Sequence, residues 1–128
     1  MIFEPLAGKR ETIITQTRTA VDFANVLKFT SDSMYPFAEK ITLVTDSLNT
    51  HSLASLYKAF PPEEARRIVN RFEWHHTPLH GSWLDMAEIE IGAMCRRALE
   101  KPLPDMKSFK NQVRAWTLRR NIECSKVN

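Results

Sequence analysis

The stretch ITLVTD, residues 41–46, decides the fold that this sequence favours. Ile41 to Val44 form a short, nearly continuous run of apolar and β-branched residues, which is typical of a strand covered on both faces. Such strands occur in layered α/β domains whose sheets are at least partly parallel. The run ends in Asp46, and ligands of open α/β sheets bind at the carboxyl ends of the strands. We therefore expect a central strand with a carboxylate at its tip.

The segments on either side of this strand alternate between β and α patterns. Period-2 runs with glycine turns predict strands, and apolar residues at a 3.6-residue period predict helices. In chain order the predicted elements are a hairpin over 2–8 and 11–16, a helix from Thr19 to Pro36, the strand at 41–46, helices over 53–60 and from Pro62, and a strand over 72–77. The order ββαβααβ predicts an α/β domain with a partly parallel sheet.

Residues 80–90, HGSWLDMAEIE, place three carboxylates at the start of a further helix. Ser82 and Asp85 have the Ser-x-x-Asp spacing of a capping box, which gives Asp85 a structural role. Residues at helical spacing predict one buried stripe, formed by Leu84, Ala87, Ile91, Cys95, Ala98 and Leu99. Glu88 falls within that stripe. Glu90 lies roughly 200° around the helix, on the expected surface, where it can pair with Arg97.

Glu88 needs a compensating partner, because an ionised glutamate on a buried stripe costs several kcal/mol. One interpretation is that Glu88 lies at the edge of the stripe and reaches into water. The other is that Glu88 and Asp46 together hold a divalent cation, since carboxylate oxygens are the ligands that magnesium prefers. Such an ion can activate water and stabilise the oxygens of a phosphoryl displacement.

Length and composition limit the other classes of function. A chain of 128 residues forms one domain at most, and we expect residues 1–104 to be its body and 105–128 its basic C-terminal helix and tail. No run approaches the roughly 20 apolar residues that span a bilayer, so we expect a cytoplasmic protein with no membrane partner. Cys95 and Cys124 cannot form a disulfide framework. The four histidines show no zinc-ligand spacing.

Positive charge is concentrated in the tail. Residues 105–128 contain six Lys and Arg but two acidic residues, a distribution typical of nucleic-acid contact or of a solvated helix face. Lys107, Lys110 and Arg114 share one face of the predicted helix, and an apolar seam lies on another. The seam consists of Met106, Phe109, Val113 and Trp116.

Two longer stretches carry a family resemblance. ITLVTDSLNTHSLASLYKAFPPEEARRI (41–68) and RFEWHHTPLHGSWLDMAEIE (71–90) resemble the catalytic domain of bacterial insertion-sequence transposases of the mariner-related Asp-Asp-Glu (DDE) superfamily. The resemblance covers nearly the whole chain. It implies a ribonuclease-H-like fold in which three acids bind two Mg²⁺ or Mn²⁺ ions, cut DNA at the transposon ends and join the 3′ hydroxyl to target DNA.

Position by position, the resemblance assigns the second acid to Asp46 and the third to Glu88. Asp46 begins the family pattern Asp-Asn-x-x-Thr-His. The resemblance implies DNA contact at Asn49, and for His51 either contact with a DNA phosphate or a role in ordering the loop after Asp46. Glu88 ends the pattern Ser-Trp-Leu-Asn-x-x-Glu. The chain departs from these patterns at Ser47 and Asp85, where the family has asparagine. Asp85 adds negative charge one turn from Glu88, which favours proton binding by that glutamate.

The family's first acid lies on a strand upstream of the segment that resembles FEPLAG (3–8), whereas this sequence starts at Met1. Asp22 belongs to the first predicted helix and cannot replace that acid. We therefore expect a ribonuclease-H-like domain truncated at its N-terminus, without its first strand, and inactive as an isolated chain. The alternative is a non-catalytic remnant that binds DNA or associates with itself or with an intact transposase.

Overall fold

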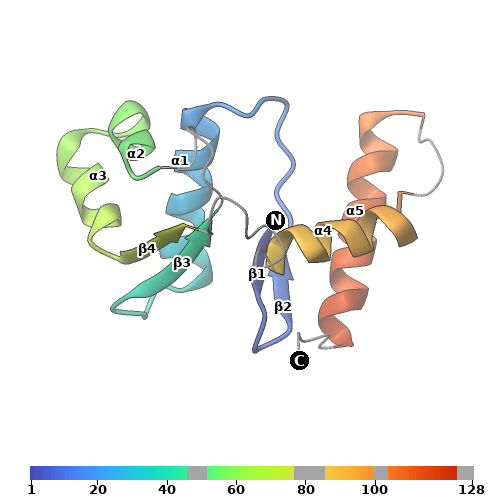
Figure 1. Ribbon diagram of the computed structural model, residues 1–128. Helices are drawn as coiled ribbons and strands as arrows, with labels where there is room; N and C mark the ends of the chain where they lie inside the picture. Colours follow the sequence, from blue (N-terminus) through green and yellow to red (C-terminus); the bar gives the residue numbers. More distant parts are fainter. Residues whose placement is uncertain (46–51, 77–85, 100–103, 124–128) are drawn as a thin grey trace. The chain divides into compact units, whose positions relative to one another are not determined.

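The parallel strand pair predicted from the sequence is present. The computed structural model describes residues 1–45, 52–76, 86–99 and 104–123. Its residues divide into an α/β unit, residues 15–82, and a hairpin unit, residues 1–14 with 83–128. In the α/β unit, β3 (Ile41–Thr45) pairs in parallel with β4 (Phe72–His76), in a register that matches Ile41 with Phe72 and Thr45 with His76 (Figure 1).

Three helices and a π-helical turn accompany this strand pair. They are α1 (Ala20–Phe29), η1 (Thr30–Met34), α2 (Ala54–Ala59) and α3 (Pro62–Val69). Helix α1 begins at a capping box: Asp22 N donates to the Thr19 hydroxyl, and Thr19 N donates to the Asp22 carboxylate. Hydrogen bonds from Thr17 and Thr19 lower the pKa of Asp22. Asp22 thus caps a helix, as expected from its place in the sequence.

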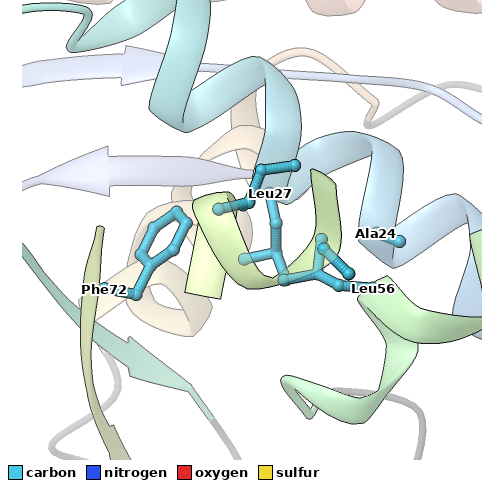
Figure 2. Close-up of a cluster of buried hydrophobic side chains, with 6 residues drawn as sticks. Ala24, Leu27, Leu56 and Phe72 are labelled. Atoms are coloured by element: carbon cyan, nitrogen blue, oxygen red, sulfur yellow. The ribbon is translucent and has the colours of Figure 1, made fainter. Parts of the chain in front are cut away.

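The core of the α/β unit is formed by residues of α1, α2, α3 and β4. Its fully buried residues are Ala24, Leu27, Leu56, Ala65, Ile68 and Phe72, of which Figure 2 labels four. Phe23 adds an edge-to-face contact with Trp74, with the ring centroids 5.7 Å apart. Burying one leucine or phenylalanine side chain stabilises the fold by about 1.5–3 kcal/mol, so these contacts are the main stabilising term of the unit.

The expectation that both faces of β3 are covered is wrong for the described residues. Ile41 and Leu43 pack against the core, whereas Thr42 is exposed and Val44 is 56% exposed. Successive side chains of a strand point to opposite faces, and the described helices of the unit contact the face that carries Ile41 and Leu43. The run at 41–44 is nearly continuous in apolar residues only because the exposed residue Val44 is also apolar.

A cluster of polar side chains links α3 to η1. Arg67 donates to both carboxylate oxygens of Asp32, at 3.0 and 2.8 Å, and also to Glu64. Arg71 donates to the backbone oxygens of Tyr35 and Ala38 at the end of the turn. The hydrogen bonds from Arg67 lower the pKa of Asp32 from 3.8 to about 2.

This pKa shift predicts a pH dependence of stability. A carboxyl group whose pKa falls on folding stabilises the protein above its unfolded pKa, and that stabilisation is lost as the pH falls through the folded value. For Asp32 this stabilisation is lost as the pH falls from 3.8 to about 2. We expect Asp32→Asn to lower the urea midpoint at pH 5 and to have almost no effect at about pH 2. A difference between the two proteins that stays constant across this range would contradict the assignment.

The hairpin unit begins with β1 (Ile2–Glu4) and β2 (Lys9–Glu11), which pair antiparallel. Gly8 N donates to Glu4 O at 3.0 Å, and Gly8 has a φ of 67°, a left-handed conformation that glycine adopts without strain. The predicted hairpin is therefore confirmed. Its second strand lies earlier than the β-branched run at 11–16 suggested.

Two helices complete this unit, α4 (Met86–Arg97) and α5 (Met106–Ile122) (Figure 1). Met94 packs with Val113 and Trp116 in its core, and Phe109 is partly buried beside them. The seam predicted for α5 is thus confirmed except for Met106, which is 49% exposed. Within the described ranges, no helix combines the length and the apolar character that a membrane crossing requires.

Candidate functional site

Helix α4 buries a different face from the one predicted. Glu90 and Met94 are buried, with 4% and 9% of their surface exposed, whereas Ile91 is 37% exposed and Cys95 is exposed. Glu88 is also exposed. The predicted surface position of Glu90 is therefore wrong, whereas the exposure of Glu88 agrees with the interpretation in which its carboxylate reaches into water. Ser82 and Asp85, the predicted cap, lie outside the described residues.

A buried arginine explains this rotation of the helix. The side chain of Arg10, on β2, is fully buried, and its Nε lies 3.2 Å from Oε1 of Glu90. Arg120, on α5, donates from Nε to the same oxygen at 2.7 Å. Glu90 thus meets two guanidinium groups, neither of them the predicted Arg97. A buried cation requires a counter-charge, so the face that carries Glu90 turns inward despite the more apolar stripe beside it.

Further hydrogen bonds hold this ion cluster of Arg10, Glu90 and Arg120 in place. Arg10 N donates to Asn121 Oδ1, and Asn121 Nδ2 donates to Arg10 O, each at 2.8 Å. The guanidinium carbon of Arg10 lies 4.8 Å from the centre of the Phe3 ring. The hydrogen bond to Glu90 raises the pKa of Arg120, so both cations remain charged at neutral pH. The cluster fixes α4 against β2 and α5.

One consequence of this cluster is the orientation of Glu88. Two residues along a helix correspond to roughly 200° of rotation, so Glu88 lies on the outer face of α4 when Glu90 points inward. An exposed carboxylate can offer hard oxygen ligands to a cation. Asp46, Asn49 and His51 lie outside the described residues. No group of three or more His, Cys, Asp or Glu side chains placed to hold a metal occurs within the ranges that are described.

The predicted DNA-contact residues of α5 all lie on its surface. Lys107, Lys110 and Arg114 are exposed, and their spacing of three and four residues places them on one face. The buried residues of the helix are Val113, Trp116 and Thr117. The same helix thus packs into the core and presents a row of positive charge, as the sequence predicted.

A family model decides the relationship to known proteins. The model, described as DDE superfamily endonuclease, matches residues 2–110. The chain belongs to the DDE superfamily of endonucleases. DDE endonucleases act on DNA and generally use divalent metal ions. Neither a curated protein nor a solved structure matches this chain.

The range of the chain that matches the DDE superfamily endonuclease model contains both predicted metal-binding acids, Asp46 and Glu88. It also contains part of α5. The mixed α/β architecture with its small sheets fits this family. Sequence reasoning missed the ion cluster. Arg10 stands between Lys9 and Glu11 in an ordinary polar strand, and nothing in the local pattern distinguishes a buried arginine from an exposed one.

Proposed function

We propose that this DDE endonuclease is the part of a transposase catalytic domain that carries the second and third acids, Asp46 and Glu88. In this proposal the complete domain cuts DNA at transposon ends and joins it to target DNA. The match to the DDE superfamily over residues 2–110 is the observation that carries the proposal. The insertion-sequence and mariner-related assignment rests on the motifs around the two acids.

Asp46 and Glu88 are the proposed ligands of Mg²⁺ or Mn²⁺. The exposed carboxylate of Glu88 fits that role, because hard divalent cations bind carboxylate oxygens. A bound ion would supply Lewis-acid stabilisation of the phosphoryl oxygens. The ion cluster around Glu90 keeps α4 in the orientation that exposes Glu88. Asn49, His51, Lys107, Lys110 and Arg114 are the proposed DNA contacts.

The first acid is proposed to come from a further strand of a ribonuclease-H-like sheet. The edge of β3 that faces away from β4 has no strand partner among the described residues, and sheets of two strands are only marginally stable alone. A strand added at this edge would extend the sheet and bring a third carboxylate. Without that acid we propose that residues 1–128 are inactive alone.

Metal binding tests this proposal. We expect Mn²⁺ to broaden the NMR signals of Asp46 and Glu88 selectively in the purified chain. Asp46→Asn and Glu88→Gln should each weaken the affinity for Mn²⁺ at least about tenfold, since even the outer partners of metal ligands contribute about that much. Glu63→Gln, at an exposed acid of α3, is the matched control and should leave Mn²⁺ affinity unchanged.

Nicking of supercoiled DNA in Mg²⁺ supplies the second measurement. The isolated chain should not nick DNA above the level of Asp46→Asn. Robust nicking that Asp46→Asn abolishes would refute the proposed inactivity. Equal Mn²⁺ broadening in all four proteins would refute the metal site.

A non-catalytic remnant is the second candidate function, and the open edge of β3 favours it. An unpaired edge that carries an exposed apolar residue such as Val44 is a template for pairing with another strand. The partner would be a second copy of the chain or an intact transposase. Concentration-dependent association that Val44→Lys reduces, together with an absence of Mn²⁺ binding, would favour this candidate.

A further inference from the structure

A small cavity lies in the hairpin unit, between the C-terminal parts of α4 and α5. It is lined by Arg97, Trp116, Arg119, Arg120 and Glu123 and has a volume of about 190 Å³. Pockets for drug-sized ligands have volumes of roughly 300–1,000 Å³. The cavity is therefore too small for a nucleotide or an organic cofactor, but it has room for one compact polar group and a few waters.

The lining carries an excess of positive charge. Arg97 and Arg119 are exposed, and neither guanidinium group has a hydrogen bond or ion pair within the described residues. Arg120 is 23% exposed, directs its Nε to Glu90 and also lines the cavity. Three guanidinium groups from two helices thus surround a volume whose inner wall is the buried indole of Trp116.

Two features of the cavity act against an anion. Glu123 is 50% exposed and lies 4.0 Å from Nη1 of Arg120. The ends of both helices also carry partial negative charge, which arginines in the last turn offset by about 0.3–1 kcal/mol each. That offset explains why arginines occur near these ends. It does not require three of them, from two helices, to line one cavity together.

We propose that this cavity binds a phosphate group. A guanidinium fork matches phosphate and carboxylate equally well, but a carboxylate presents one plane and two oxygens. A phosphate group presents at least two free oxygens in a tetrahedral arrangement and can accept from arginines that approach from different directions. The phosphate belongs either to a nucleic-acid backbone or to a free phosphoanion. The proposal goes beyond the DDE site, because Glu88 is not among the described residues that line the cavity.

Titration with inorganic phosphate, followed at the indole N–H of Trp116 by ¹H–¹⁵N NMR, tests the proposal. We expect the native chain to show a saturable shift of this signal. The double variant Arg97→Ala/Arg119→Ala should weaken phosphate binding at least about tenfold, since two charge-assisted hydrogen bonds are lost. Glu123→Gln should tighten binding several-fold, because it removes a carboxylate from the lining.

The matched control is Arg66→Ala/Arg96→Ala, which removes the same charge at two exposed arginines outside the cavity. This variant should bind phosphate as the native chain does. The proposal is overturned if the native signal does not shift, if both double variants weaken binding equally, or if Glu123→Gln leaves the affinity unchanged. None of these measurements depends on metal or on DNA cleavage, so they fail or succeed independently of the proposed function.

A second arm identifies the source of the phosphate. Affinity for a duplex oligonucleotide is measured at several salt concentrations for the native chain and both double variants. If the cavity holds a backbone phosphate, the slope of log K against log salt should fall in magnitude by about 0.9 in Arg97→Ala/Arg119→Ala but not in the control. If Arg97→Ala/Arg119→Ala loses binding of inorganic phosphate but keeps the slope of the native chain, the cavity binds a free phosphoanion.

Discussion

Replacing Glu90 with alanine should destabilise the protein by about 3–5 kcal/mol, because the change leaves the buried guanidinium of Arg10 without its counter-charge. The second partner, Arg120, would lose its charge-assisted hydrogen bond as well. The free energy of unfolding is measured by urea denaturation, followed by the fluorescence of Trp116 in a variant that lacks the other two tryptophans.

The control for this experiment is Glu88→Ala, two residues away on the same helix. Glu88 is exposed, so this substitution should change stability by no more than about 0.5 kcal/mol. Equal effects of the two substitutions would contradict the described orientation of α4. The double variant Arg10→Met/Glu90→Met should recover much of the loss, since apolar residues of similar size often replace a buried ion pair at little cost.

Leu56→Ala should destabilise the α/β unit by about 2–5 kcal/mol. Leu56 is completely buried among Ala24, Leu27 and Ile68, and a well-packed core refills such a cavity only in part. Hydrogen exchange of amides in α1 and β3 measures the loss within this unit.

Lys58→Ala, on the exposed side of the same helix, is the matched control and should alter exchange free energies by less than about 0.5 kcal/mol. If both substitutions accelerated exchange equally, Leu56 could not be the core residue that the structure describes.

The sequence was sufficient for the order of elements and for a partly parallel sheet, because both follow from local periodicity and from the alternation of strands with helices. The apolar seam of α5 also predicted which of its faces is buried, apart from Met106. That face interacts mainly through the hydrophobic effect, which periodicity reports directly.

The buried face of α4 could not be predicted from its apolar residues, because an electrostatic interaction decides the rotation of this helix about its axis. Its apolar stripe through Ile91 and Cys95 competes with a face that carries only Met94 and Glu90 as buried residues. The outcome depends on Arg10, which lies 80 positions earlier in the chain and whose burial no local pattern reports. Glu88 is therefore proposed as the third acid on the family motif alone, because Glu88 does not lie on a buried stripe.

The hairpin unit joins residues 1–14 to residues 83–128, and this has a consequence for biosynthesis. Arg10 hydrogen-bonds to Asn121, 111 positions away, so β1 and β2 cannot complete their contacts until α5 has been translated. Residues 15–82 form a contiguous unit and can fold during elongation. A nascent chain that stalls before α5 would leave an arginine destined for burial exposed, where chaperones and proteases would meet it first.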